Sequence, residues 1–295
     1  MKRFALAFSL SLALMLCAPA WGQAASYGFH TINYPNDTFT QLLGINNSLI
    51  IAGYHNFNQN SGLTLRLPFL FTTENFPNSM MTQVIGISNN GVTDGFYVDN
   101  NGVTHGFFNN MGTYTTVDFA GTAFNQLLGQ NDLGIASGYY SMSQNNSTPD
   151  TPYTYDENMN TFTAITISGS PGGAQATGVN NAGQVCGFYI DAMGTNHGFL
   201  LIGGVLTTLD APNSTFTQAL GLNNKGQVVG AFMDQMGNTH GFVWTAANGF
   251  TTIGDPNGVG TTIVNGINDH GDLVGFYGTA PVNSGFIAFP LAQRL

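Results

Sequence analysis

One pattern recurs along almost the entire chain at intervals of 42 to 49 residues, and this repetition restricts the fold more than any other feature. Its clearest copy, residues 217–253, contains Thr-Gln-Ala-Leu-Gly-Leu-Asn-Asn, then Val-Val-Gly, His-Gly-Phe and Phe-Thr-Thr-Ile. The first glycine of the pattern occurs six times, at Gly44, Gly86, Gly129, Gly178, Gly221 and Gly266. We therefore interpret residues 25–295 as a single domain of six repeats.

Each copy divides into four short segments that are typical of β-strands. The segments are rich in Val, Ile, Phe, Tyr and Thr, and turn residues bound them on both sides. Asn-Asn-x-Gly and Asp-x-x-Gly sequences between them fit tight hairpins, in which glycine adopts the positive φ that other residues resist. No segment after the first 24 residues shows sustained helical periodicity, so the sequence predicts an all-β protein.

The two ends of the repeat region complement each other. The last copy contains three strand segments, at 263–267, 272–277 and 284–289, and lacks the fourth. Residues 29–35 match the fourth segment of an earlier copy, residues 206–212. Such a permutation closes a ring and removes free sheet edges, whereas an open β-solenoid or a pair of β-sandwiches gives no reason for it. The sequence thus predicts a six-bladed β-propeller with four antiparallel strands per blade and the N-terminal strand closing the last blade.

The repeat also resembles a known family. Gly-Ile-Asn-Asn-x-Gly-Gln-Val-Val-Gly-x-Tyr, followed by His-Gly-Phe and Phe-Thr-Thr-Ile-Asp-x-Pro, is similar to the bacterial extracellular HAF repeat, which is named for a His-Ala-Phe signature. His-Gly-Phe stands here at His105, His197 and His240, and the histidine is missing from the first, third and sixth copies. The resemblance covers nearly all of residues 25–295. It implies an extracellular repeat protein and assigns no shared activity or catalytic residues.

The first 24 residues have the features of a signal peptide. Lys2 and Arg3 precede an apolar run from Ala5 to Cys17, and small residues follow. This run is shorter than the roughly 20 residues that a membrane span needs. Cleavage after either Ala20 or Ala24 fits, and no later segment is apolar for long enough to cross a membrane. We expect a secreted or periplasmic protein.

Charge and cysteine content limit the partners and the means of stabilisation. After removal of the signal, three basic residues remain against fifteen carboxylates, which gives a formal charge of −12. Such a chain repels a phosphate backbone, so nucleic acid is excluded as a partner. Cys186 becomes the only cysteine, so no intramolecular disulfide can form and the hydrophobic core must hold the fold.

Repeated carboxylates suggest one candidate binding surface. They follow second or fourth strand segments and are expected on one face of the ring: Asp99, Asp118, Asp191, Asp210, Asp234 and, with a shift of one residue, Asp255. An acidic face can attract Ca²⁺ or cationic groups, but Asp also bonds the amides of its own turn. No dedicated calcium-loop spacing is present, so we assign no metal site and no cofactor, and Ca²⁺ stays an open alternative. The repeated histidines, in separate copies, are interpreted as structural.

Repeated glutamines suggest a second candidate surface. They occupy the first strand segment of five copies: Gln41, Gln83, Gln126, Gln175 and Gln218. If this segment is the innermost strand, their amides line the central channel. There they can bind sugar hydroxyls, or they can bond neighbouring repeats and channel water.

Catalysis on a symmetric scaffold usually depends on residues that break the symmetry. Glu74 and Glu157 are the only glutamates, so an acid–base pair for glycoside chemistry is one hypothesis. Both are expected at third-to-fourth strand connections, on the face opposite the aspartates and in different blades. Three functions therefore stay open: binding of carbohydrate or an extracellular protein, polysaccharide degradation by a hydrolase or lyase, and a structural role in an envelope or matrix.

Overall fold

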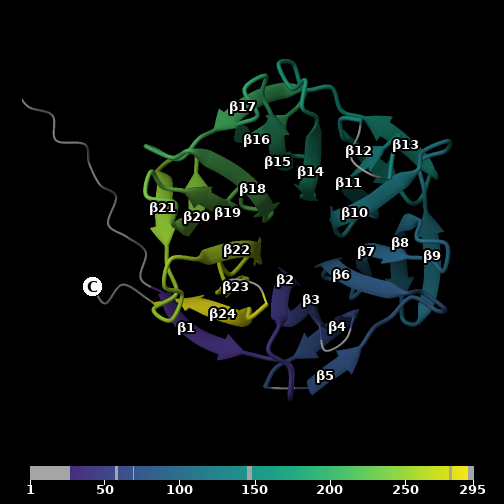
Figure 1. Cartoon of the computed structure of the whole chain (residues 1–295), viewed down its shortest axis with the longest axis horizontal. Helices are drawn as coiled ribbons and strands as arrows, with labels where there is room; N and C mark the ends of the chain where they lie inside the picture. Colours follow the sequence, from purple (N-terminus) through teal and green to yellow (C-terminus); the bar gives the residue numbers. More distant parts are fainter. Residues whose placement is uncertain (1–26, 57–58, 69, 145–147, 279–280, 292–295) are drawn as a thin grey trace, which may run out of the picture.

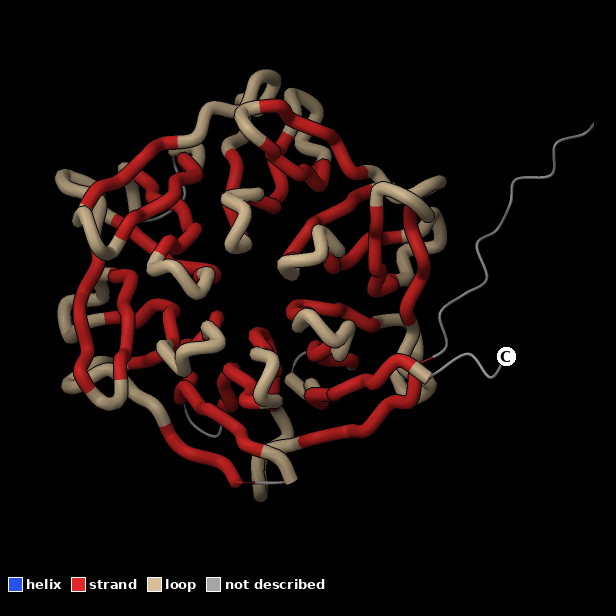
Figure 2. The backbone as a smooth tube through the Cα atoms, turned by 180° about the vertical axis from the view of Figure 1, so that it is seen from behind, coloured by secondary structure: helices blue, strands red, loops and turns tan. Residues whose placement is uncertain are grey.

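The computed structural model describes residues 27–56, 59–68, 70–144, 148–278 and 281–291. These residues form 24 β-strands and no helix, so the all-β expectation is confirmed for this part of the chain. The strands are arranged in a ring, seen from its two sides in Figure 1 and Figure 2. The expected signal peptide lies outside the described residues. Within the described ranges, no helix has the length and apolar character needed to cross a membrane.

The strands occupy four positions from the centre of the ring to its edge (Figure 1). The innermost strands are β2 (Thr40–Ile45), β6 (Met81–Ile87), β10 (Phe124–Gln130), β14 (Ala174–Val179), β18 (Phe216–Leu222) and β22 (Thr262–Ile267). The second strands are β3 (Ile50–Asn56), β7 (Thr93–Val98), β11 (Ile135–Ser141), β15 (Val185–Ile190), β19 (Val228–Met233) and β23 (Leu273–Tyr277). The third strands are β4 (Asn60–Arg66), β8 (Thr104–Asn110), β12 (Thr151–Asp156), β16 (Asn196–Ile202), β20 (Thr239–Thr245) and β24 (Ser284–Pro290). The outermost strands are β5 (Leu70–Thr73), β9 (Thr113–Val117), β13 (Thr161–Ala164), β17 (Val205–Leu209), β21 (Gly249–Ile253) and β1 (Tyr27–Ile32).

The expectation of six blades, each a separate four-stranded sheet, is wrong. Hydrogen bonding divides the strands into four sheets of four strands and one continuous sheet of eight, which contains β6 to β13. The two parts of the large sheet join where Phe124 of β10 pairs in parallel with Thr104 of β8. Similar parallel bridges link other neighbouring sheets, but there they lie outside the named strands. The neighbouring sheets of this propeller are therefore joined by backbone bonds as well as by side chains.

The N-terminal strand closes the ring, as the sequence predicts. β1 pairs antiparallel with β24, and the sheet order is β1-β24-β23-β22. Ile32 at the end of β1 is 3% exposed and packs in one cluster with Leu42, Ile51, Leu65 and Val274, which come from four other strands. The first strand of the chain therefore supplies core contacts both to its own sheet and to the neighbouring sheet of β2 to β5.

Six glycines allow the inner strands to approach one another. An added Cβ on Gly44 would lie 2.6 Å from the carbonyl oxygen of Ile85 and 3.1 Å from the Cα of Gly86. The glycines at the other five positions face their neighbours in the same way, and the circle returns from Gly266 to Gly44 at 3.2 Å. A side chain here would push adjacent inner strands apart, which explains why each repeat keeps the glycine.

A ring of hydrogen bonds connects the turns that follow the inner strands. We call it the asparagine ring; its members are Asn47, Asn89, Asp132, Asn181, Asn224 and Asp269. The backbone N–H of each member donates to the side-chain oxygen of the next, at 2.7–2.9 Å, and the circle is complete. The two carboxylates also accept side-chain amides from both neighbours. Every turn at this end of the ring is thus fixed to its neighbours.

Candidate binding site at the central channel

The inner strands surround a cavity of about 410 Å³, the central channel. Each inner strand has a β-bulge at the residue before its glycine. The six bulged residues line the waist of the channel: Leu43, Ile85, Leu128, Thr177, Leu220 and Asn265. The channel wall is therefore mostly apolar at this level. Towards the asparagine ring, a second space of about 60 Å³ continues the channel.

The structure places all five glutamines of interest along the channel wall, two residues before the bulges. We call this end the glutamine mouth; it comprises Gln41, Gln83, Gln126, Gln175 and Gln218. Three of the amides are bonded: Gln41 accepts from the Tyr54 hydroxyl at 2.8 Å, Gln175 donates to Asp150 at 2.7 Å, and Gln218 donates to Asn196 at 3.1 Å.

Gln83 and Gln126 differ from the other three, because neither side-chain amide bonds another described residue. They lie at equivalent positions of β6 and β10, the two inner strands of the eight-stranded sheet. One sector of the glutamine mouth therefore presents two free amides, each with donors and an acceptor.

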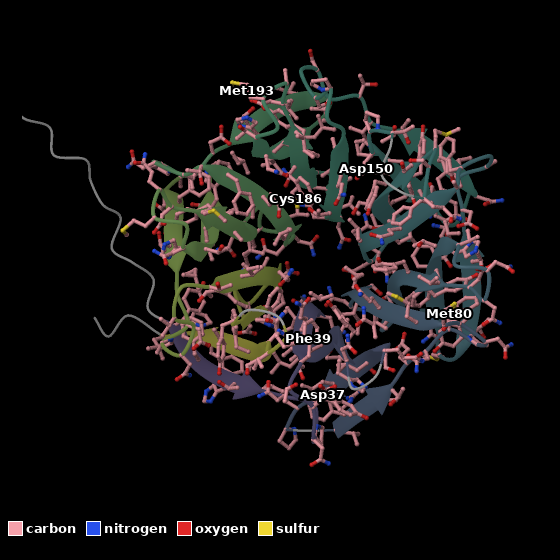
Figure 3. The ribbon with its side chains drawn as sticks, in the orientation of Figure 1. Asp37, Phe39, Met80, Asp150, Cys186 and Met193 are labelled. Carbon is pink, nitrogen blue, oxygen red and sulfur yellow. The ribbon has the colours of Figure 1, made fainter. Side chains whose placement is uncertain are left out.

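Aromatic side chains accompany the glutamines. Phe124, which begins β10, is partly exposed and lies 5.6 Å from the ring of Tyr139, the residue paired with Gln126 in β11. Phe39 and Tyr54 form an equivalent pair in the first repeat, also with ring centroids 5.6 Å apart, and Figure 3 shows Phe39 on the inner side of the ring. Amides next to aromatic rings are the groups that bind a ligand with both hydroxyls and apolar faces.

Most of the acidic residues form bonded clusters rather than a free acidic rim. His197 lies between Asp210, at 2.9 Å from Nδ1, and Asp191, at 3.3 Å from Nε2. His105 lies between Asp118 and Asp99 in the same way, at 2.7 and 3.7 Å. Burial opposes protonation, but the two carboxylates raise the pKa of His197. The clusters therefore join the second-to-third strand turn to the end of the outer strand.

The aspartates in these turns also bond their own backbone. Asp99 Oδ1 accepts the amides of Val103 and Asn101, which lower the pKa of Asp99. Asp191 is held in the same way, and in the next repeat Asp234 bonds His240 at 2.9 Å. Because the same bonds recur in three repeats, these contacts stabilise the turns.

Asp255 does not belong with these exposed aspartates. It is 5% exposed and occupies the position that Ala211 holds in the preceding repeat, where the backbone N–H bonds a threonine hydroxyl on the next inner strand. One of its oxygens, Oδ2, is buried and has no hydrogen-bond partner among the residues that the structure describes. The shift of one residue that the sequence comparison allowed thus moves the carboxylate from the surface into the interior.

The two glutamates are not brought together as an acid–base pair. Glu157 is exposed in the turn between β12 and β13. Glu74 follows the outer strand β5, not a third-to-fourth strand connection, and it is 7% exposed. It takes the place of Ile32, Val117 and Leu209 in other repeats, so its expected place at a third-to-fourth strand connection was wrong.

A buried polar cluster surrounds Glu74, and sequence reasoning missed it. At the equivalent position in another repeat, Ile32 packs against Ile51 and Leu65. Glu74 instead accepts a hydrogen bond from Thr93, the counterpart of Ile51. Burial raises the pKa of Glu74, while the bonds from Asn109 and Thr93 lower it. The signal was present in the sequence: positions that are apolar in the other repeats are polar at Glu74, at the end of the first repeat, and at Thr93 and Asn109 in the second.

Asp94, the neighbour of Thr93, is fully buried. It stands where other repeats have Ala52, Cys186 or Val229, and neither of its carboxylate oxygens has a hydrogen-bond partner among the described residues. Burial raises the pKa of Asp94 to about 7. The nearby amide of Gln130, which donates its hydrogen bond to the carbonyl of Val92, opposes this rise, and the charge of Glu74 adds to it.

In the part of the chain that the structure describes, no set of side chains is arranged to bind a metal ion. No group of three or more His, Cys, Asp or Glu side chains there could hold a metal ion. Cys186, labelled in Figure 3, is 0% exposed, and burial raises the pKa of its thiol to about 12.

Comparison with solved structures places the fold among β-propellers. The fucose-binding lectin of the fungus Aleuria aurantia, described as six-bladed, is 10% identical and has a TM-score of 0.55, with 88% of this chain and 95% of the lectin covered. A gluconolactonase from Xanthomonas campestris is 8% identical with a TM-score of 0.53, covering 85% and 87% of the two chains. A streptogramin B lyase is 12% identical with a TM-score of 0.50, covering 88% and 97%.

These similarities show the fold alone. The chain is a β-propeller. Propellers of this shape include lectins and enzymes, so the fold does not select between binding and catalysis. No protein-family model and no curated protein matches the sequence, and the resemblance to HAF repeats stays a prediction.

Proposed function

We propose that this chain is a carbohydrate-binding propeller, exported to the periplasm or the cell exterior, and that its glutamine mouth is the binding site. The observation that carries this proposal is the pair of free amides, Gln83 and Gln126, in the wall of a cavity of about 410 Å³ that Phe96, the residue paired with Gln83, also lines. The expected signal peptide supports the location.

The chemistry of the mouth fits sugars better than a purely apolar ligand. A primary amide donates and accepts at the same time, so it can bind two adjacent hydroxyls, and an aromatic ring packs against the C–H face of a pyranose. The bonded amides of Gln41, Gln175 and Gln218 keep the rest of the wall fixed. A site of this kind needs little rearrangement on binding, which reduces the entropic cost of association.

The test begins with a glycan array probed with residues 25–295, followed by isothermal titration calorimetry with the best ligand. Gln126→Ala and Gln83→Ala are each expected to weaken binding by about 5-fold to 10-fold, because each removes about one net hydrogen bond. Gln235→Ala is the matched control, since Gln235 is exposed in the turn between β19 and β20 and does not line the channel.

The outcomes separate the alternatives. A blank array, or equal loss of affinity in the channel variants and in the Gln235→Ala control, would overturn the proposal. Capture of an extracellular protein in place of any glycan would show that the mouth serves protein recognition instead.

A further inference from the structure

Asp150 is a carboxylate at the glutamine mouth without a counterpart in the other repeats. It comes directly before β12, at a position filled elsewhere by neutral residues: Asn60, Thr104, Asn196, Thr239 and Asn283. At this position Asn196 accepts the amide of Gln218, and Asp150 accepts the amide of Gln175. Figure 3 shows Asp150 closer to the centre of the ring than Met193. The repeat therefore places one negative charge beside the channel.

The bonding of Asp150 leaves one oxygen available. Oδ2 accepts Nε2 of Gln175 at 2.7 Å, whereas Oδ1 has no side-chain partner among the described residues. The residue is half-buried, and burial raises its pKa while Gln175 opposes the rise. The pKa of Tyr139 is raised by burial and further by the charge of Asp150, so that phenol lies within electrostatic reach of the carboxylate.

Among the described residues, no basic side chain forms an ion pair with Asp150. Arg66 ends β4 and Lys225 lies in the turn between β18 and β19, and both of these places are on the opposite face from the glutamine mouth. The ion pairs of the described residues all join histidines to other aspartates. A half-buried carboxylate without a counterion favours a cationic ligand group, because the group recovers electrostatic energy that solvent only partly supplies.

We propose that the glutamine mouth prefers an amino sugar, whose protonated amine binds Asp150 Oδ1 while its hydroxyls bind Gln126 and Gln83. This inference rests on the proposed carbohydrate function and specifies its ligand. A single carboxylate suits an ammonium group better than a divalent metal ion, which takes several oxygen ligands. The partly exposed ring of Phe124, which lies 5.6 Å from the ring of Tyr139, adds a surface that attracts cations.

The experiment compares two trisaccharides by calorimetry at pH 6, where a primary amine is protonated: a glucosamine trimer and its fully N-acetylated form. The wild-type protein is expected to bind the glucosamine trimer about 10-fold or more tightly, in line with a charge-assisted hydrogen bond. Asp150→Asn should lower the affinity for the glucosamine trimer by about 10-fold and leave the affinity for the N-acetylated trimer unchanged. Asp210→Asn, on the same face but bonded to His197, controls for the loss of one negative charge.

Each other result has a definite meaning. If the wild-type protein binds both trimers equally, or if Asp150→Asn weakens both to the same degree, the amine preference is wrong and the carbohydrate function stands. If Asp210→Asn has the same effect as Asp150→Asn, long-range charge explains the preference and the contact with Asp150 is refuted. If neither trimer binds and the glycan array is also blank, the proposed function itself fails.

Discussion

The buried carboxylate of Asp94 makes the stability of this propeller depend on pH in a direction opposite to that of most aspartates. Its pKa is about 7 in the folded protein, against an ordinary value of 3.8. Between these two values the folded state holds a proton that the unfolded state has lost. The free energy of unfolding therefore decreases as pH rises through this window, and the full penalty is present above pH 7.

The magnitude follows from the two pKa values. Each pH unit within the window changes the free energy of unfolding by about 1.4 kcal/mol, so the contribution of Asp94 between pH 5 and pH 8 is about 2.5 kcal/mol. Asp94→Asn keeps the shape of the side chain and removes the charge. We expect the variant to gain about 2.5 kcal/mol over the wild type when pH is raised from 5 to 8.

Urea unfolding monitored by the fluorescence of Trp244 and by circular dichroism measures this difference at each pH. Groups that do not interact with Asp94 titrate equally in the variant and the wild type, so their contributions cancel when the two free energies of unfolding are subtracted. Asp156→Asn is the control for net charge, because Asp156 ends β12 and its Oδ1 accepts backbone amides that asparagine can also bond. If the difference for Asp94→Asn changes by less than about 0.5 kcal/mol across this range, Asp94 is not a protonated buried group and the reasoning fails.

Three further predictions concern the ring and its core. Ile32→Ala should lower the free energy of unfolding by about 2–4 kcal/mol, because it opens a cavity where β1 closes the ring. Thr31→Ala, at an exposed position of the same strand, should change the free energy of unfolding little. Equal effects of the two substitutions in urea titrations would refute the role of β1. Gly44→Ala should destabilise the protein by about 1–3 kcal/mol, since the added Cβ meets the Ile85 carbonyl, whereas Gly254→Ala, with open space around it, should be neutral or slightly stabilising in the same assay. Cys186 should react with a thiol reagent only after unfolding, and rapid labelling of the native protein would contradict its complete burial.

The repeat pattern predicts the strands and the closure because both depend on local sequence. Each strand is a short run of β-branched and aromatic residues between turns, and β1 completes the last sheet because residues 29–35 repeat a fourth-strand sequence. The joining of two sheets could not be predicted in this way. It depends on one parallel pair, Phe124 with Thr104, whose residues happen to fall within strands.

The candidate site is only partly readable from the sequence. The five glutamines share a position, so their place beside the channel follows once the inner strand is identified. Which amides are free does not follow, because it depends on the hydroxyl of Tyr54 and on the residue before each third strand. Asp150 breaks the pattern at that position, but an inserted loop before it makes the repeats hard to align.

Glu74 and Asp94 show why sequence alone misplaced some acidic residues. A carboxylate in a β-rich protein is usually exposed, and the sequence gives no direct sign of burial. Here Thr93 and Asn109 are polar as well, and their hydrogen bonds satisfy Glu74 inside an otherwise apolar layer. Comparing each residue with its counterparts in the other repeats reveals such clusters.

Photo-crosslinking tests the central claim, that the glutamine mouth binds carbohydrate, most directly. A glycan selected on the array would carry a diazirine, and mass spectrometry after chymotrypsin digestion would locate the adducts; chymotrypsin is chosen because three basic residues offer few sites for trypsin. We predict adducts in β6 and β10, around Gln83 and Gln126, that disappear with excess free glycan. Adducts concentrated on the outermost strands or on the asparagine ring would contradict the account.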